Sequence, residues 1–564
     1  MLLGSRKRPS SDDSTDSEQH KRTRHEHEPG ELAAVSSTCE LSDLPNELLL
    51  HILSFIPEVQ YATAVSSVCR RWYRLYLASR RSLTLATARN EPAASNRGDD
   101  GTVALVSEGR SVLLRMLASC PQLREIDTAD VHIVDSDVAA MAEQHPRLRR
   151  LTLFSCNRLT DSSLASISHF QRLRALTMRF ALCIPATAWH SLLRQRSFVC
   201  SLESFSSTLA QIDDEAVEAF VHNASPERLS SLHLSVCTLV TGASLALLAL
   251  HHPQLKSLDF PAPHATDAQL TLMCERMTRL EQLQLWSATN LTPTHVASMS
   301  TSLRELYLPL AGNAPAIVST IAEHLVGLRK LLLNIDGRLT LTDVEPLVER
   351  LALLELLEIE CRRGIEADAV SCITRLTQLQ TLRLTACVDL SDTTLMRLAR
   401  SLQRLSALEL GPCHNITDCA MYSVATSGSP HLTRLMLLGA RSLDDRAVSR
   451  LALAPRKLLE FTLEESQISD RGVASLAHSF PSLRLLSLAL SSQLSSACIS
   501  TFLLFPKLRH LRITGCQGIT DDALPLLCNL TQLESLSLGH MPLLSQQSIE
   551  TLKATLPNLT VISF

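Results

Sequence analysis

The sequence predicts an α/β solenoid, a horseshoe with short parallel strands on its concave face and helices on its convex face. Three observations favour this class: a leucine pattern recurs at a nearly constant period, each copy changes from strand spacing to helix spacing, and cysteines recur at one fixed place in the copy. One copy is too small to bury its own apolar face, so neighbouring copies must stack into a continuous core.

The repeating unit is clearest in the stretch KLRHLRITGCQGITDDALPLLCNLT. Leu511 and Ile513 are two residues apart, which places both side chains on one side of a short strand. Leu524 and Leu527 are three residues apart, which suits one face of a helix. Thr520 precedes two aspartates, a pattern typical of a helix N-cap with acidic residues at the positive end of the helix dipole. The unit is therefore predicted to be strand, turn and helix.

An opening of the L-x-x-L-x-L type, with other residues in place of the second or third leucine in several copies, occurs eighteen times, at spacings of 23 to 29 residues that are mostly 25 or 26. The first leucines are Leu123, Leu148, Leu173, Leu202, Leu229, Leu255, Leu280, Leu303, Leu328, Leu354, Leu379, Leu405, Leu432, Leu458, Leu483, Leu508, Leu533 and Leu559. Cysteines follow the first leucine by eight residues at Cys156, Cys237, Cys387, Cys413 and Cys516. This pattern resembles the cysteine-containing subclass of leucine-rich repeats, whose units read L-x-x-L-x-L-x-x-C-x-x-(I/L)-T-D. We assign residues 111–564 to a leucine-rich-repeat solenoid of about 18 repeats.

Composition narrows the classes of partner. The net charge of −4 and the pI of about 6.6 give no basic stripe of the kind that a nucleic-acid backbone requires. The densest apolar stretch, 245–250, is far shorter than the roughly 20 residues that a bilayer needs, so no membrane partner is expected. The cysteines are distributed like small buried hydrophobes rather than a disulfide framework, which favours a reduced intracellular setting.

Residues 1–38 are polar and charged with almost no apolar periodicity, and they are predicted to be a disordered tail. Two basic clusters, 6–8 and 21–24, have the spacing of a two-part nuclear import signal across 6–24. An ordinary solvated tail is the alternative, and the sequence leaves both open. We expect a cytoplasmic or nuclear location, or both.

Residues 39–80 predict three short helices. Pro45 suits the first turn of a helix, where its missing N–H costs nothing, and Pro57 ends that helix. The first helix is apolar almost all round, so it must be covered on more than one side. An apolar face close to Trp72 is typical of a docking surface.

The Leu-Pro start of this module and its Val-Cys-x-x-Trp end resemble the F-box. An F-box ahead of leucine-rich repeats is the arrangement of substrate receptors of SCF-type ubiquitin ligases. The resemblance implies binding to a Skp-type adaptor and, through it, to a cullin, with a protein substrate held by the repeats. The adaptor-binding residues that it implies are Leu44, Pro45, Leu48, Ile52, Leu53, Val68, Cys69 and Trp72. The alternative, that these residues only build a helical cap on the solenoid, stays open.

Residues 81–110 are predicted to be a linker or an elaborated connection. Pro92, Gly98 and Gly101 argue against one continuous helix in this segment.

The recognition surface follows from the strand pleat. Residues two, four and six positions after the first leucine of a repeat are expected to face the concave surface. The candidate substrate-binding residues at these positions are Phe154, Trp286, Tyr307 and Lys330. Trp286 and Tyr307 fall on adjacent strands, which favours one aromatic patch. The alternative is scattered surface residues, among which Arg383, Glu409 and Arg434 pair across strands.

Motifs for catalysis, cofactor binding and metal binding are missing from the sequence: it has no phosphate-binding glycine loop, no H-E-x-x-H and no paired C-x-x-C ligands. We expect no catalytic residue, no cofactor and no metal. The predicted function is a non-catalytic, substrate-recognising subunit of an SCF-type ubiquitin ligase. An interaction scaffold without a ubiquitin role and a ligand-assisted receptor are the alternatives.

Overall fold

The computed structural model describes residues 77, 80–84, 102–104, 109–128, 131–154, 156–310, 314–387, 390–453, 457–530, 532–555 and 560–562. The tail at 1–38 with its basic clusters, and the three helices predicted within 39–80, lie outside the described residues, which include only residues 77 and 80 of that module.

Twenty strands form one parallel sheet in the described part of the chain. From β3 onward each strand pairs with the next in the sequence, so every repeat adds one strand to the same ladder. At the start of the ladder β1 lies between β2 and β3. The strands are β1 (Ser82–Thr84), β2 (Thr102–Ala104), β3 (Glu125–Asp127), β4 (Arg150–Leu153), β5 (Ala175–Arg179), β6 (Ser204–Thr208), β7 (Ser231–His233), β8 (Ser257–Pro261), β9 (Gln282–Trp286), β10 (Glu305–Leu310), β11 (Lys330–Ile335), β12 (Leu356–Ile365), β13 (Thr381–Cys387), β14 (Ala407–Leu410), β15 (Arg434–Leu437), β16 (Glu460–Leu463), β17 (Leu485–Ser487), β18 (His510–Arg512), β19 (Ser535–Ser537) and β20 (Thr560–Ile562).

A helical segment follows each strand from β3 to β19 and returns the chain to the next strand. The α-helices are α4 (Gly109–Ser119), α5 (Asp135–Gln144), α6 (Asp161–Ile167), α7 (Ala186–Leu193), α8 (Arg196–Val199), α9 (Asp214–Asn223), α10 (Gly242–His251), α11 (Asp267–Arg276), α12 (Pro293–Ala297), α13 (Ala314–His324), α14 (Leu341–Arg350), α15 (Ala367–Cys372), α16 (Asp392–Ser401), α17 (Asp418–Ser427), α18 (Asp445–Leu451), α19 (Asp470–Ser479), α20 (Cys498–Phe502), α21 (Leu524–Leu527) and α22 (Gln546–Thr555). Two 3₁₀ helices, η2 (Ile373–Arg375) and η3 (Asp521–Ala523), accompany α15 and α21.

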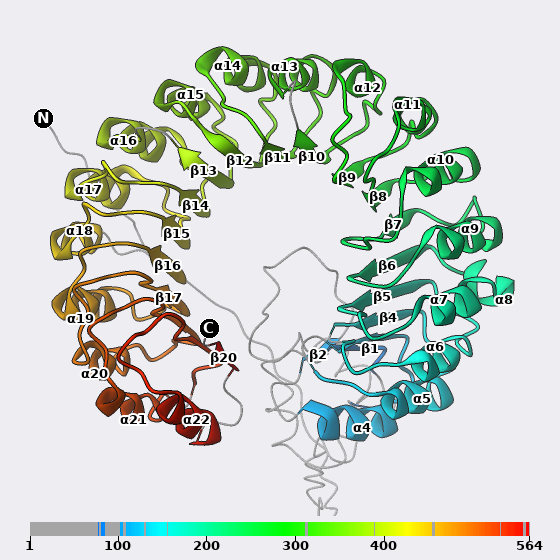
Figure 1. Ribbon diagram of the computed structural model, residues 1–564, viewed down its shortest axis with the longest axis horizontal. Coiled ribbons are helices and arrows are strands. Elements are labelled where there is room, and N and C mark those ends of the chain that lie inside the picture. The colour runs from blue at the N-terminus through cyan, green and yellow to red at the C-terminus, as the bar shows by residue number, and fades with distance from the viewer. Residues whose placement is uncertain are drawn as a thin grey trace, which may run out of the picture.

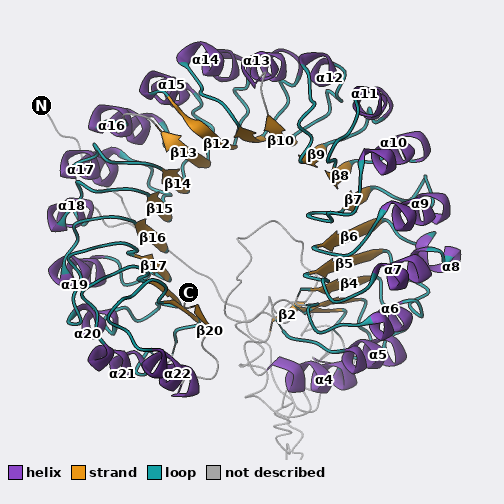
Figure 2. Cartoon of the chain, in the orientation of Figure 1, coloured by secondary structure: helices purple, strands orange, loops and turns teal. Residues whose placement is uncertain are grey.

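The ladder curves because its two faces have different widths. Neighbouring strands lie about 4.8 Å apart, whereas packed helices need about 8–10 Å between their axes. The helices therefore take the longer outer path and the strands the shorter inner one, as Figure 1 and Figure 2 show. The curve continues until α4 and α22 stand on either side of one opening (Figure 1).

The core is the stack of leucines between the two layers. In the unit that starts at Leu508, the exposed fractions of Leu508, Leu511 and Ile513 are 1%, 2% and 0%. All five cysteines of the eighth-residue position are buried, four of them after the strand and Cys387 as the last residue of β13. The eighteen predicted repeat starts each lead into one of the strands β3–β20, and the leucine-rich-repeat solenoid is confirmed. Only β20 departs from the predicted register, by one residue, because Leu536 pairs with Val561 rather than with Ile562.

Two parts of the chain depart from the simple strand–turn–helix repeat. β1 and β2 lie within the 81–110 segment that we assigned as a linker, so the sheet begins before residue 111. The unit that starts at Leu173 returns through two helices, α7 and α8, around a fully buried Trp189.

Thr520 begins its helix as predicted, with two aspartates in the first turn, but it does so without a side-chain cap bond. Thr520 is the N-cap residue, but its side chain accepts no bond from the helix and instead contacts the Ser496 hydroxyl at 2.9 Å. The chain enters the 3₁₀ helix η3, and Pro525 occupies the first turn of the short α21.

Candidate functional site

The strand pleat sorts side chains between the core and the concave surface as predicted. On β9 the burial alternates, with Leu283 and Leu285 in the core and Gln282, Gln284 and Trp286 half-buried. Because the strands from β3 to β19 are parallel and pair in the register of the repeat, apart from the irregular end of β12, residues at the same place in successive repeats form rows across the concave face.

Trp286 and Tyr307 are in direct contact on this face. Their ring centroids are 4.4 Å apart and the ring planes are inclined by 37°. Tyr307 pairs in register with Gln284, so Trp286 reaches it diagonally from the next row of β9. Aromatic rings at about this separation attract each other more strongly than the burial of their surfaces alone would predict, which stabilises the relative arrangement of Trp286 and Tyr307.

A buried carboxylate fixes the tryptophan. Trp286 Nε1 donates a hydrogen bond to Asp259 Oδ1 at 2.6 Å, and the Ser235 hydroxyl donates to Asp259 Oδ2. Asp259 is 7% exposed and has no ion-pair partner among the described residues. The carboxylate is therefore held by two neutral donors. Its bond to Trp286 orients the indole, and no cation compensates its negative charge among the described residues.

The nearest titratable group to this carboxylate in the sheet register is neutral at pH 7. His233 lies opposite Asp259 on β7, and burial lowers the pKa of His233, although the Asp259 charge opposes that shift. The ring contacts the Ser257 hydroxyl at 2.7 Å. His233 thus adds no positive charge next to Asp259 at neutral pH.

Carboxylates also lie on the other side of Tyr307. In the same row, Tyr307 pairs with Leu332 and Leu332 pairs with Glu358; Glu360 follows two residues later on β12. Burial first, and then the charges of Glu360, Glu358 and Asp259, raise the pKa of the Tyr307 hydroxyl. We call the set Asp259, Trp286, Tyr307, Glu358 and Glu360 the aromatic–acidic cradle.

Cations on neighbouring strands are engaged in ion pairs. Lys330 Nζ lies 2.8 Å from Glu305, the residue beside it on β10. Arg383 lies between two carboxylates, 3.1 Å from Glu358 and 3.3 Å from Glu409. The predicted pairing across strands is therefore confirmed for Arg383 and Glu409, but Arg434 joins no ion pair in the part of the chain that the structure describes.

Phe154 belongs to a different part of the concave surface. Its ring makes an edge contact with Phe180, with centroids 5.8 Å apart, and the Arg179 guanidinium lies 5.1 Å from its centroid. The structure thus brings Trp286, Tyr307 and Lys330 to neighbouring strands and places Phe154 directly after β4, five strands before β9.

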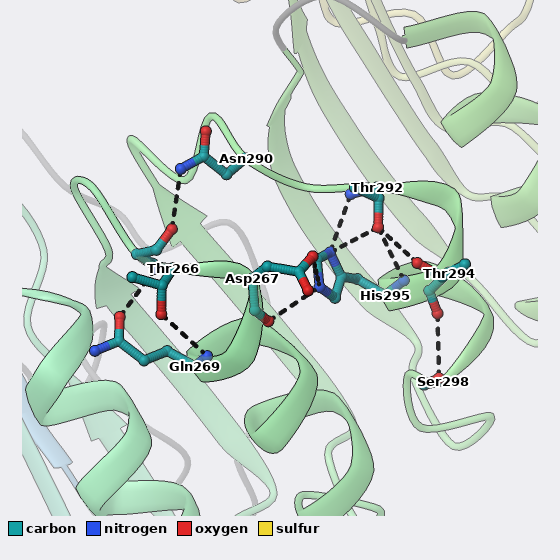
Figure 3. A network of polar contacts seen from close by, with 9 residues as sticks. Thr266, Asp267, Gln269, Asn290, Thr292, Thr294, His295 and Ser298 are labelled. Atoms are coloured by element: carbon teal, nitrogen blue, oxygen red, sulfur yellow. Dashed lines mark hydrogen bonds and ion pairs between the residues drawn. The ribbon is translucent and has the colours of Figure 1, made fainter.

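The helix side of the same repeats holds a polar network that the sequence analysis missed (Figure 3). The buried ring of His295 accepts a hydrogen bond at Nδ1 from the Thr292 backbone N–H at 3.1 Å. Its Nε2 is then the donor toward Asp267 of the preceding repeat, whose Oδ1 lies at 3.2 Å and whose carbonyl oxygen lies at 3.3 Å. In the preceding repeat, Thr266 and Gln269 bond each other in a capping box.

This network ties the two helices behind the aromatic pair, α11 and α12, to each other. The Asn290 amide adds a bond to the Ala265 carbonyl at 3.0 Å. The only signal in the sequence is Thr292 followed by His295, the spacing of a capping box with histidine in the place of glutamate.

The regular cysteines lie in environments that suppress the thiolate. Burial raises the pKa of Cys156 and Cys387 to about 12, and that of Cys237 and Cys516 to about 11. Within the described ranges, the side chains of histidine, cysteine, aspartate and glutamate form no group of three suited to a metal ion. Across those ranges, no helix has the length and apolar character needed to cross a bilayer.

The residues predicted to bind an adaptor, Leu44 to Trp72, lie outside the described residues. The comparison with protein families matches this region: residues 41–81 fit the F-box-like family.

The chain also resembles several known proteins. It is 26% identical over 230 residues to a transport inhibitor response 1-like protein of Oryza sativa subsp. japonica, across 38% of this chain and 40% of that relative's length. Among solved structures, the yeast complex of Rad7 and Elc1 matches with a TM-score of 0.41 and 15% identity, over 76% of this chain and 88% of that chain. An internalin of Listeria monocytogenes matches with a TM-score of 0.30 and 18% identity, over 67% of this chain and 87% of that chain.

The N-terminal domain and the solenoid occur in the order that the sequence predicts. The F-box-like match ends at residue 81, and the parallel ladder begins with β1 at Ser82. Residues 41–81 thus match the F-box-like family, and a leucine-rich-repeat solenoid follows them in the same chain.

Proposed function

We propose that this chain is the substrate-recognition subunit of an SCF-type E3 ubiquitin ligase. The observation that carries the proposal is the F-box-like domain at 41–81 directly before a long solenoid with an open concave surface. The F-box binds a Skp-type adaptor, which joins the chain to a cullin, and the concave surface holds the protein to be ubiquitinated. Catalysis arises from proximity, because the assembly holds a substrate lysine close to the charged ubiquitin carrier.

The two binding activities belong to separate sets of residues. Leu44, Pro45, Leu48, Ile52, Leu53, Val68, Cys69 and Trp72 contact the adaptor. Trp286 and Tyr307 anchor the substrate, since a rigid aromatic pair on a concave surface is the kind of group that contributes most to protein binding. Lys330 borders this anchor, and Phe154 contacts a more distant part of the same substrate.

A reciprocal pair of variants tests the assignment. The triple variant Leu44→Ala/Pro45→Ala/Trp72→Ala should lose the adaptor in pull-down experiments and still retain the substrates found by proximity labelling under proteasome inhibition. The double variant Trp286→Ala/Tyr307→Ala should show the opposite behaviour.

Retention of the adaptor by the triple variant would contradict the proposal and favour an interaction scaffold without a ubiquitin role. Unchanged substrate capture by the double variant would remove the aromatic pair from the binding surface and leave the adaptor assignment intact.

A further inference from the structure

We infer that the aromatic–acidic cradle binds a basic segment of the protein partner, with a lysine or arginine stem lying on Tyr307 and Leu332 and its charged head at Glu358 and Glu360. The inference rests on the proposed function and names the chemistry of the substrate that the concave surface takes.

The first support is the balance of charge on the central strands. From β8 to β14 the inward-facing positions carry the carboxylates of Asp259, Glu305, Glu358, Glu360 and Glu409. The cations at such positions are Lys330, which pairs with Glu305, Arg383, which Glu358 and Glu409 share, and the exposed Arg362 two residues after Glu360. The carboxylates exceed the cations, so this part of the surface attracts positive charge.

The second support is the state of two particular carboxylates. Asp259 is held only by the neutral donors Trp286 and Ser235. Glu360 is exposed and accepts a hydrogen bond at 2.9 Å from the neutral Asn334 amide. Neither forms an ion pair within the described residues, although Arg362 follows Glu360 closely on the irregular end of β12. A partner's cation therefore meets at Glu360 an exposed carboxylate without an ion pair among the described residues, while the buried Asp259 adds negative potential from below.

The third support is the apolar floor between the charges. Tyr307, Leu332 and Glu358 lie in one row on successive strands, so the backbones of Tyr307 and Glu358 are two strand spacings, about 10 Å, apart. Lysine and arginine bury an apolar stem and keep a charged end, which matches a floor of Tyr307 and Leu332 that ends at carboxylates. The faces of Trp286 and Tyr307 add attraction for a cation.

The test uses the full-length chain and a displayed library of random twelve-residue peptides as the probe. The wild-type chain should enrich peptides rich in lysine and arginine, and their affinity should fall as salt is raised from 50 to 300 mM because screening weakens the charge attraction. Glu358→Gln/Glu360→Gln, which keeps shape and removes charge, should weaken the selected peptides by about fivefold or more. The matched control is Glu460→Gln, an inward-facing glutamate on β16 outside the cradle, which should leave their affinity unchanged.

Several outcomes would overturn the inference: no enrichment of any peptide, enrichment without a basic bias, or equal loss in the Glu460→Gln control. A variant with glutamine at Arg6, Lys7, Arg8, Lys21, Arg22 and Arg24 identifies a competing occupant. Tighter peptide binding by this variant would mean that the chain's own basic clusters fill the cradle, which also overturns the inference. Adaptor pull-down is independent of these measurements, so failure here is distinguishable from failure of the proposed ligase role.

Discussion

Asp392, the first residue of α16, accepts two hydrogen bonds from Thr417, the N-cap of the next repeat's helix. The Thr417 backbone N–H lies 2.7 Å from Oδ1, and its hydroxyl lies 2.5 Å from Oδ2. The same pair of bonds joins Asp135 to Thr160, Asp214 to Thr241, Asp445 to Ser469 and Asp470 to Ser495. The T-D end of the repeat motif is therefore a bridge between repeats as well as a local cap.

Removing one bridge should destabilise the solenoid at that junction. We expect Asp392→Ala to lower the free energy of unfolding by about 1–3 kcal/mol, because two charge-assisted bonds are lost and the Thr417 N–H loses its acceptor. Urea unfolding followed by circular dichroism measures the change, and hydrogen exchange in α16 and α17 locates it.

Asp161→Ala is the matched control for this bridge. Asp161 also begins a helix, so its loss removes the same interaction with the helix dipole. The next helix begins after Pro185, which has no N–H to donate, and among the described residues the Asp161 carboxylate accepts no bond from the next repeat. An effect of Asp161→Ala as large as that of Asp392→Ala would show that the bridge contributes nothing beyond the dipole.

Two buried histidines predict a loss of stability in mild acid. His145 and His252 each occupy the position three residues before the first leucine of a repeat, and Nε2 of each contacts a backbone carbonyl of the preceding repeat, at 3.1 Å and 2.9 Å. Nδ1 of each ring is buried and has no hydrogen-bond partner among the residues that the structure describes, so a second proton finds no acceptor there.

The sign of the pH effect follows from the pKa shifts. Burial lowers the pKa of both His145 and His252 below the ordinary value of 6.5, so the unfolded chain takes up these protons first. Stability should therefore fall as the pH drops below about 6.5 and continue to fall until the lowered pKa is reached.

His145→Leu/His252→Leu should flatten this dependence, because Leu325 and Leu351 occupy the equivalent position in other repeats. Melting temperatures at pH 7.5 and 5.5 measure it. The exposed His478→Leu should leave the dependence as it is in the wild type; an equally steep profile in the double variant would refute the assignment.

The burial of the regular cysteines predicts selective alkylation. Cys183 and Cys419 are exposed, whereas Cys156 and Cys387 are buried with a pKa of about 12. Only the thiolate reacts quickly, so iodoacetamide at pH 8 should label the first two in the native chain. The buried two should react only after urea is added, as read by mass spectrometry of the peptides. Native labelling of Cys156 would show that the repeat opens locally at that turn.

The leucine spacing predicted the architecture because the two periods, two for strands and three to four for helices, are local properties of each unit. It predicted which side chains of β9 and β10 face inward for the same reason. The repeat period alone places Trp286 and Tyr307 on adjacent strands, so their proximity could also be predicted from the sequence. In contrast, the bond from Trp286 to Asp259 joins residues 27 positions apart, and its formation depends on rotamers that no spacing rule specifies.

The helix starts show a further limit of sequence reasoning. Thr520 and Thr417 stand in the same sequence pattern, yet Thr417 caps its helix and Thr520 bonds Ser496 instead. Pro525 explains part of the difference, because it limits the helix that Thr520 would cap. The hydrogen bonds from each aspartate to the next repeat could not be predicted for a different reason. They join residues about one period apart, and the same aspartates could equally have had only a local role at the helix dipole.

The bond between Trp286 and Asp259 predicts a measurable coupling in the aromatic–acidic cradle. Trp286→Phe keeps an aromatic ring and removes the donor, so the buried Asp259 carboxylate retains only the Ser235 hydroxyl. We expect the free energy of unfolding to fall by about 1–3 kcal/mol, the cost of leaving a buried acceptor underbonded. Asp259→Asn keeps an acceptor and removes the charge, so Trp286→Phe should cost less in that background.

A double-mutant cycle in urea measures the difference, and a coupling of about 0.5 kcal/mol or more is expected for residues in contact. Tyr307→Phe serves as the control, because the Tyr307 hydroxyl bonds to no group among the described residues and its removal should change the free energy of unfolding by less than about 0.5 kcal/mol. Strict additivity of the two cradle substitutions would mean that Asp259 does not orient the indole. The tryptophan face offered to a partner would then be set by packing against Tyr307 alone.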